Sequence, residues 1–124
     1  MQEMIIREKL SKVYFKNLRK LKNITLPKIL PNNKSAWHIF PIRTKKRNFL
    51  KEFLLKKGIQ TLIHYPIPPH LQPAYKSLAF KKGDFPISEK IHDQILSLPL
   101  YSTLKIEDIN YICEALLEVD ELLI

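Results

Sequence analysis

Residues 58–75 read GIQTLIHYPIPPHLQPAY, and this stretch sets polar groups on a rigid frame. Gly58 follows a helical pattern and predicts its end, and the β-branched residues after it predict a short strand over 59–64. Four prolines then fix the backbone of residues 65–73 as a stiff loop. The polar side chains at this loop are His64, Tyr65, His70 and Gln72. Such groups on a rigid loop are typical of a binding site, and a connector with packed rings fits the spacing equally well.

The rest of the chain alternates helical and extended patterns around this loop. Apolar residues at three- and four-residue steps predict helices, and β-branched or aromatic runs predict strands. The expected helices span 3–21, 45–57, a segment that starts at Pro86, and 105–121, with a helical turn over Pro73–Leu78. The expected strands span 36–42 and 59–64, with a brief extended stretch at 98–100. This order predicts an α+β fold in which helices cover a short, mostly antiparallel sheet.

Individual side chains are expected to define the helix ends and the buried faces. Thr44 and Asp84 are placed as N-caps of the second and third helices, and Gly58 as the left-handed residue that ends the second. Pro41 places its strand at an edge or a bulge, because proline cannot donate to a ladder. The expected buried faces are Phe49, Leu50, Phe53 and Leu54 in the second helix, Ile87, Ile91 and Ile95 in the third, and Ile109, Ile112, Cys113 and Leu116 in the last.

Composition excludes several classes of protein. The 124 residues correspond to one domain, with 2 Gly against 9 Pro, so neither a P-loop nor a Rossmann fingerprint can be built. The single cysteine excludes an internal disulfide and a cysteine-based zinc site, and it fits a reducing compartment. Charges interrupt every apolar run, so we expect no targeting or membrane-spanning segment and a soluble protein of the cytoplasm.

Residues that could carry metal or nucleophilic chemistry are scattered. None of the four histidines falls into a zinc-binding spacing, so no metal site is expected. Cys113 lies on the apolar stripe of the last helix, where a buried thiol acts as a small hydrophobe. We therefore predict no self-contained active site.

Basic residues concentrate in the first half of the chain. Residues 1–62 carry a net charge of +13 and residues 63–124 a net charge of −4. Six lysines and arginines of the 45–57 helix could neutralise phosphates. A small basic nucleic-acid-binding module is therefore the alternative function, although no single-strand aromatic platform or helix-turn-helix pattern accompanies the charge. The simpler interpretation is a solvated lysine face.

Several segments together resemble the DegT/DnrJ/EryC1/StrS sugar aminotransferases. The similar stretches are SAWHIFPIR (35–43), RNFL through KGI (47–59), HYPIPPHLQPAY (64–75), KGDFP (82–86), LSLPL (96–100) and the helix of 109–116. The resemblance covers essentially the whole chain. It implies that residues 1–124 are the C-terminal small domain of a fold-type I aminotransferase, and that the N-terminal cofactor-binding large domain is absent.

The resemblance also implies an activity. Family members use pyridoxal phosphate to transfer an amino group from glutamate to a nucleotide-linked keto-sugar. The sequence of the 64–75 loop is most similar to that of members that act on dTDP-3-oxo-6-deoxyhexoses for surface polysaccharide or glycan biosynthesis. His64 and Tyr65 are then the expected sugar contacts, with His70 and Gln72 as secondary contacts or loop organisers. The Schiff-base lysine lies outside this chain, so we expect the chain alone to bind no pyridoxal phosphate and to be inactive. A large domain and a homodimer partner are the implied protein partners.

Two further expectations follow from the comparison with the family pattern. Lys105 stands where the last helix usually opens with Thr or Ser, which removes a cap worth about 1 kcal/mol. Met4, Ile5 and Tyr14 of the first helix are candidates for apolar surface that the large domain would cover. The isolated chain is therefore expected to be marginally stable or self-associating. A truncated gene product and one half of a split enzyme both fit this sequence.

Overall fold

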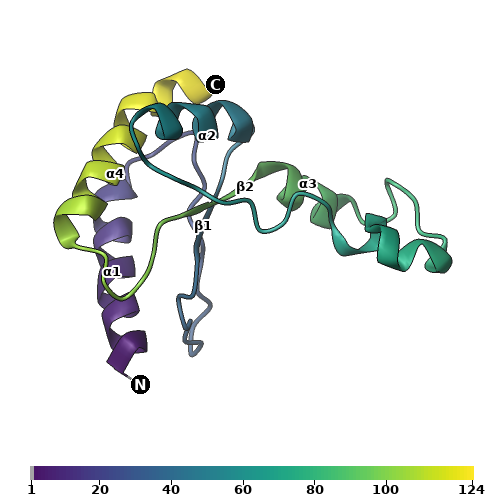
Figure 1. Ribbon diagram of the computed structural model, residues 1–124, viewed down its shortest axis with the longest axis horizontal. Coiled ribbons are helices and arrows are strands. Elements are labelled where there is room, and N and C mark those ends of the chain that lie inside the picture. The colour runs from purple at the N-terminus through teal and green to yellow at the C-terminus, as the bar shows by residue number, and fades with distance from the viewer. Residues whose placement is uncertain (1) are drawn as a thin grey trace.

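The computed structural model describes residues 2–124 (Figure 1). Its α-helices and strands, in chain order, are α1 (Gln2–Leu18), β1 (Phe40–Arg43), α2 (Arg47–Lys56), α3 (Pro86–Gln94), β2 (Ile95–Leu98) and α4 (Ile106–Val119). Three short 3-10 helices complete the list: η1 (Pro69–Leu71), η2 (Pro73–Leu78) and η3 (Asp120–Leu123). The helical turn expected over Pro73–Leu78 is confirmed with its predicted bounds.

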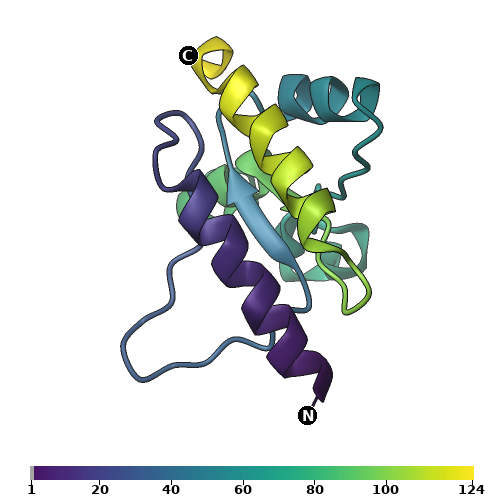
Figure 2. The same cartoon turned by 90° about the vertical axis from the view of Figure 1, so that its left-hand side faces the viewer.

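The part of the structure outside residues 64–94 is called here the body, and a two-stranded antiparallel sheet forms its centre. Phe40 of β1 pairs with Leu98 of β2, and Arg43 pairs with Ile95 at the other end. The helices α1 and α4 lie side by side in front of β1 (Figure 2). The predicted α+β class, with helices covering a short antiparallel sheet, is confirmed.

An aromatic cluster lies between α1 and the sheet. The Tyr14 and Phe40 rings stack with centroids 4.6 Å apart, and Trp37 stacks on Phe40 from 5.5 Å. The Tyr14 hydroxyl donates to the Pro99 carbonyl at 2.8 Å, and burial raises the pKa of Tyr14 well above its usual value. The prediction that Tyr14 is exposed was wrong, because its partner for the hydroxyl lies 85 residues away in sequence. Met4 and Ile5 are exposed as expected.

The strands are shorter than the sequence predicted. Trp37 has φ of +48°, a left-handed conformation that a strand does not allow, so β1 begins only at Phe40. Residues 59–64 form no strand, although Leu62 makes one antiparallel bridge with Ser97. The third helix ends at Gln94, and Ile95 starts β2 rather than continuing the helical stripe.

The helix ends follow the predictions in part. Gly58 has φ of +76°, and the amides of Gly58 and Ile59 donate to the carbonyls of Leu55 and Leu54, which is a Schellman motif. The prediction that Thr44 is the N-cap of the second helix was wrong, because α2 begins at Arg47 and Lys46 is in the N-cap position. The Thr44 hydroxyl instead accepts from the Lys46 amide at 3.4 Å, one turn ahead of the helix. Asp84 was expected to cap α3, but its carboxylate accepts instead from the Lys81 amide at 2.7 Å.

The buried faces of the helices differ in their agreement with the sequence. All four residues expected inside the last helix are buried in α4. In α2 only Leu50 and Leu54 are fully buried, while Phe49 is exposed. In α3 no residue is buried, and Ile87 is 77% exposed.

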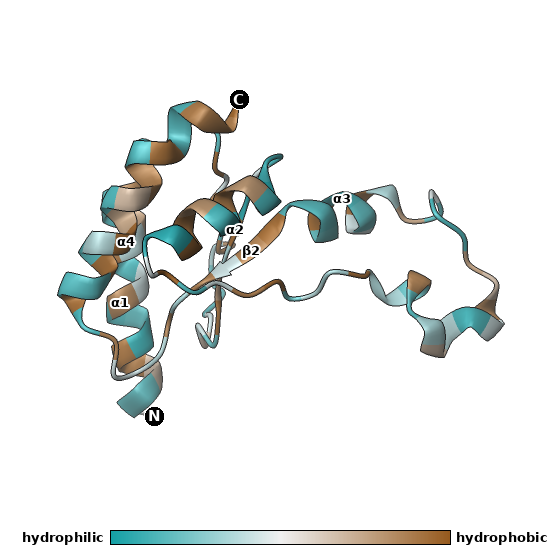
Figure 3. Cartoon of the chain, turned by 45° about the horizontal axis from the view of Figure 1, so that its top comes forward, coloured by the Kyte–Doolittle hydropathy of each residue, from teal (hydrophilic) through white to brown (hydrophobic). Residues whose placement is uncertain are grey.

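Residues 64–94, called here the arm, extend away from the body (Figure 1). Pro68 is the only buried residue within this range. Figure 3 marks hydrophobic residues at several points along this segment. The large apolar side chains exposed on the arm are Tyr65, Ile67, Tyr75, Leu78, Phe80, Phe85 and Ile87. The arm therefore has almost no core of its own. None of the helices within residues 2–124 has the length and apolar character needed to cross a membrane.

Candidate functional site

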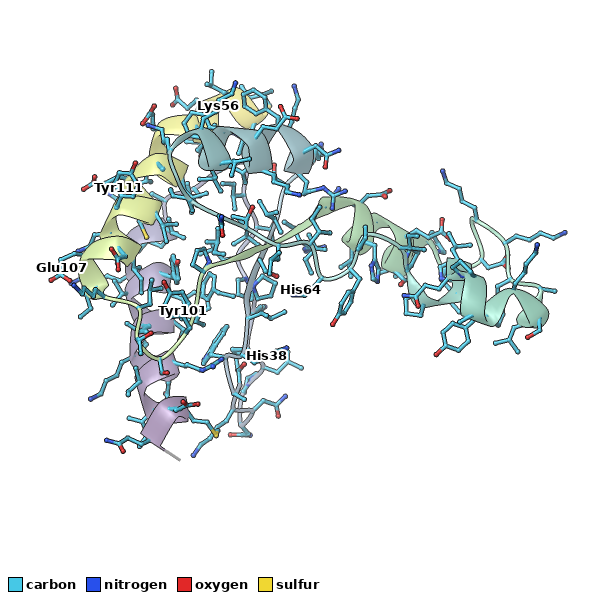
Figure 4. The ribbon with its side chains drawn as sticks, viewed as in Figure 1. His38, Lys56, His64, Tyr101, Glu107 and Tyr111 are labelled. Carbon is cyan, nitrogen blue, oxygen red and sulfur yellow. The ribbon has the colours of Figure 1, made fainter. Side chains whose placement is uncertain are left out.

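A half-open cavity of about 760 Å³ lies in the body. Its walls come from residues 58–64, from residues 97–104 and from the first turns of α4. His38, His64 and Tyr101 lie along it, with Tyr111 on the α4 side (Figure 4). The volume falls in the range of small-molecule sites, and imidazole and phenol groups line it.

His64 reaches this cavity from the end of the extended segment beside β2. The Leu62–Ser97 bridge fixes the backbone two residues earlier. The His64 Nδ1 atom lies 2.9 Å from the Ser97 Oγ atom, so one ring nitrogen is engaged inside the fold. The Nε2 atom makes no hydrogen bond to residues 2–124. His64 can therefore offer this nitrogen to a ligand.

Tyr65 follows His64 across a cis peptide bond and does not line the cavity. Its ring stands edge-on to the His64 ring with centroids 5.4 Å apart, and it is 62% exposed. The hydroxyl has no hydrogen-bond partner among the described residues, whereas the backbone carbonyl accepts from Nδ1 of His92. The backbone of Tyr65 is thus held in place while its hydroxyl is available.

His70 and Gln72 are engaged within the arm. The His70 Nε2 atom lies 3.0 Å from the Glu89 Oε1 atom, and both side chains are largely buried. Gln72 donates from Nε2 to the Ile67 carbonyl at 3.1 Å. His70 also lines a small apolar hollow of about 360 Å³ in the arm, apart from the large cavity. The structure therefore brings His64 and Tyr65 together and places His70 and Gln72 elsewhere.

The Glu89 carboxylate joins three segments of the arm through its hydrogen bonds. It accepts from the Gly83 amide at 2.8 Å and from the Phe85 amide at 3.4 Å, besides its contact with His70. The backbone hydrogen bond from Gly83, followed by the bond to His70, lowers the pKa of the Glu89 carboxyl. Glu89 thus stays ionised and ties η1 to the start of α3.

Four residues with a role at the site were not identified as such from the sequence. Ser97 and His92 hold His64 and Tyr65, Glu89 holds His70, and Arg47 donates to the His92 and Ile95 carbonyls at 3.3 Å. Ser97 alone left a signal in the sequence, because it is the single polar residue in the apolar run 95–100. The other three needed the tertiary structure.

Metal and nucleophile chemistry find no support in the described part of the chain. Residues 2–124 contain no group of three or more His, Cys, Asp or Glu side chains that could hold a metal ion. Burial raises the pKa of the Cys113 thiol to about 11, so the thiol stays protonated near neutral pH.

The basic residues of α2 and its flanks divide into two groups. Arg47 turns inward to the carbonyls before β2, and Lys57 forms an ion pair with Glu118 at 2.7 Å. The hydrogen bond that Lys57 donates to the Glu118 carboxylate raises the pKa of Lys57. The remaining basic side chains are exposed, as Figure 4 illustrates for Lys56, and they are Lys45, Lys46, Lys51 and Lys56.

Comparison with known proteins places this geometry in a family. The family model for the DegT/DnrJ/EryC1/StrS aminotransferases matches residues 2–117. The chain belongs to this family. The resemblance of the sequence motifs is thereby confirmed.

Relatives and solved structures match over most of the chain but over a minor part of their own length. The dTDP-3-amino-3,6-dideoxy-alpha-D-galactopyranose transaminase of Aneurinibacillus thermoaerophilus is 41% identical over 79% of this chain and 27% of its own length. DesV of S. venezuelae, solved in complex with a ketimine intermediate, superposes with a TM-score of 0.93 at 36% identity, over 97% of this chain and 32% of DesV. The pyridoxal phosphate form of the sugar aminotransferase Spr1654 from Streptococcus pneumoniae gives a TM-score of 0.84 at 25% identity, over 99% of this chain and 32% of Spr1654. The chain thus spans about a third of the length of the proteins it matches.

The lining of the 760 Å³ cavity lacks the groups that usually hold pyridoxal phosphate, the cofactor of this family. Pyridoxal phosphate is held through a lysine imine and a set of phosphate donors. Neither lysine nor arginine lines the 760 Å³ cavity, and its one carboxylate, Asp108, already accepts from the Lys105 amide at 3.3 Å. Gly58 and Gly83 stand in open surroundings rather than in a phosphate cradle.

Proposed function

We propose that residues 1–124 are the small C-terminal domain of a pyridoxal-phosphate-dependent nucleotide-sugar aminotransferase. The observation that carries the proposal is the family match over residues 2–117, together with the superposition on DesV. The whole enzyme would transfer an amino group from glutamate to a dTDP-linked keto-deoxyhexose in the cytoplasm. The name of the Aneurinibacillus thermoaerophilus relative supports this substrate class, and surface polysaccharide or glycan biosynthesis is the process that such a product would serve.

His64 and Tyr65 are the proposed sugar contacts within this domain. Each keeps one polar atom, the His64 Nε2 and the Tyr65 hydroxyl, without a partner among residues 2–124, while a hydrogen bond inside the fold fixes its position. Fixed donors of this kind lose little entropy when a ligand binds. His64 borders the large cavity, which supports its assignment.

His70 and Gln72 organise the loop in this proposal. Their polar atoms are engaged with Glu89 and with the Ile67 carbonyl. A ligand would have to break these bonds before it could use them, and a hydrogen bond lost in a partly buried site destabilises it by about 1 kcal/mol. We therefore rank them below His64 and Tyr65 as sugar contacts.

The cofactor and its lysine belong, in this proposal, to a large domain outside the 124 residues. The poor fit of pyridoxal phosphate to the cavity supports this division. The apolar side chains of the arm and the exposed Met4 and Ile5 of α1 would then be covered by that large domain and by a homodimer partner. Covered surfaces of this type are enriched in aromatic residues.

The test joins this chain, from α1 onward, to the cofactor-binding portion of the Aneurinibacillus thermoaerophilus relative. We expect the joined protein to consume glutamate in the presence of a dTDP-linked keto-deoxyhexose. The 124-residue chain alone should consume no glutamate and bind no pyridoxal phosphate. The unaltered relative serves as the positive control. Turnover by the 124-residue chain alone, or a folded, cofactor-loaded joined protein without turnover on any nucleotide-linked keto-sugar, would contradict the proposal.

A further inference from the structure

Ser97 occupies a position that the sheet fixes from both sides. It stands opposite Pro41 of β1 and exchanges two backbone hydrogen bonds with Leu62, at 3.2 and 2.7 Å. The residue is 4% exposed. A serine in this setting has little freedom in its backbone, so its hydroxyl has a defined place relative to His64.

The hydrogen of the Ser97 hydroxyl has a single acceptor within residues 2–124. That acceptor is the Nδ1 atom of His64, 2.9 Å from Oγ. Ser97 is 4% exposed and its hydroxyl has no other hydrogen-bond partner among residues 2–124, so we assign the hydroxyl as the donor and Nδ1 as the acceptor. In a neutral imidazole one nitrogen accepts and the other carries the hydrogen. His64 therefore carries its hydrogen on Nε2, the nitrogen that is left for a ligand.

His92 provides a contrast in the same part of the molecule. Its Nδ1 atom contacts the Tyr65 carbonyl, and a carbonyl oxygen can only accept. The Nδ1 atom of His92 must carry the hydrogen. The hydrogen-bond partners of His64 and His92 thus assign opposite tautomers to the two histidines.

We propose that Ser97 is a positioning residue that holds His64 as an Nε2–H donor toward the ligand. The inference rests on the proposed function, in which His64 contacts the sugar. Its consequence is chemical selectivity: the ligand atom opposite His64 is an oxygen that accepts a hydrogen bond, such as a hydroxyl or phosphate oxygen, and a group that can only donate is excluded. In this proposal the Ser97 hydroxyl, which lines the same cavity, sets this preference through the His64 ring.

The first test reads the tautomers directly in the 124-residue chain. We expect ring ¹⁵N NMR at neutral pH to show His64 with the hydrogen on Nε2 and His92 with the hydrogen on Nδ1. In Ser97→Ala the His64 ring signals should shift toward exchange between both forms, while the His92 signals stay unchanged and show that the variant folds. Ser11→Ala removes another buried hydroxyl, which donates to the Glu8 carbonyl at 2.8 Å, and should leave His64 unaltered. A wild-type His64 with its hydrogen on Nδ1, or ring signals that Ser97→Ala does not move, would overturn the inference.

The second test measures the consequence for the substrate in the protein joined to a large domain. Loss of a neutral hydrogen bond to the ring predicts that Ser97→Ala raises the KM for the keto-sugar about three- to tenfold and leaves the KM for glutamate unchanged. Ser97→Thr keeps the hydroxyl and should restore the value. If His64→Ala raises the sugar KM and Ser97→Ala does not, this inference fails while the proposed function stands. If His64→Ala has no effect, the proposed contact fails, and with it the selectivity assigned here.

Discussion

Replacing Lys105 with serine is expected to stabilise the fold, because α4 begins without a side-chain cap. Lys105 has φ of −84° and ψ of 153°, the extended conformation that an N-cap residue adopts. The Asp108 carboxylate already accepts from the Lys105 amide at 3.3 Å, so one half of a capping box is in place. A serine hydroxyl at this position would complete the box by accepting from the Asp108 amide.

The expected gain combines two effects. A serine N-cap is worth about 1 kcal/mol relative to alanine. Removal of a positive charge from the N-terminal end of a helix adds about 0.5 kcal/mol, because that end carries partial positive charge. For a chain of this length, a gain of about 1.5 kcal/mol corresponds to a rise in Tm of about 5 °C.

Urea unfolding followed by circular dichroism separates the two contributions. Lys105→Ala removes the charge without supplying a hydroxyl, so it serves as the matched control. We expect Lys105→Ser to exceed Lys105→Ala by about 1 kcal/mol in the free energy of unfolding. If the serine variant were no more stable than the alanine variant, the assignment of Lys105 as the N-cap would be refuted.

Four further predictions concern single groups. Gly58→Ala should lower the free energy of unfolding by about 1 kcal/mol through φ of +76° alone, since no atom stands within 4 Å of the added Cβ, and thermal unfolding would measure this. Tyr14→Phe should destabilise by about 1–3 kcal/mol near neutral pH, because the Pro99 carbonyl loses its donor. The pKa of Tyr14 is raised in the folded state, so the contribution of its protonated phenol to stability is complete below pH 10.0 and is lost progressively above it. A Tyr14→Phe variant whose free energy of unfolding falls as steeply with alkaline pH as that of the wild type would contradict this. The pKa of Glu89 is lowered from 4.5, so the stability that its carboxylate contributes is present above pH 4.5 and is lost as the pH falls below it. Hydrogen exchange of the Gly83 amide, relative to its intrinsic rate, should therefore rise on acidification in the wild type and show no such rise in Glu89→Gln.

The sequence was most informative where the apolar period was long and unambiguous. The buried face of α4 followed from a 3.6-residue period sustained over four turns. Ile95 belonged to a helical stripe with Ile87 and Ile91, yet it starts β2 because pairing with Arg43 of β1 outweighs local periodicity. The left-handed backbone conformation of Trp37 could not be predicted from the sequence, since an aromatic residue ordinarily favours extended backbone.

The candidate site divides in the same way. The loop pattern marked His64, Tyr65, His70 and Gln72 together, because prolines next to polar side chains are visible in one stretch of sequence, and the family resemblance ranked the first two as sugar contacts. Their supports are not, because Ser97 lies 33 residues from His64 and His92 lies 27 residues from Tyr65. The contact between His70 and Glu89 spans 19 residues and was hidden for the same reason. Pairings of this kind arise only when the arm leaves the body and returns as β2.

The sugar half-reaction of the joined enzyme tests the account most directly. His64→Ala and Tyr65→Phe should each lower kcat/KM for the dTDP-linked keto-sugar, by about tenfold if one hydrogen bond to the ligand is lost, while kcat/KM for glutamate changes little. Tyr75→Phe, which removes another exposed phenol of the arm, is the matched control and should change neither value. An equal loss in both half-reactions, or no loss in either, would contradict the assignment of His64 and Tyr65 as the groups that this domain presents to the sugar.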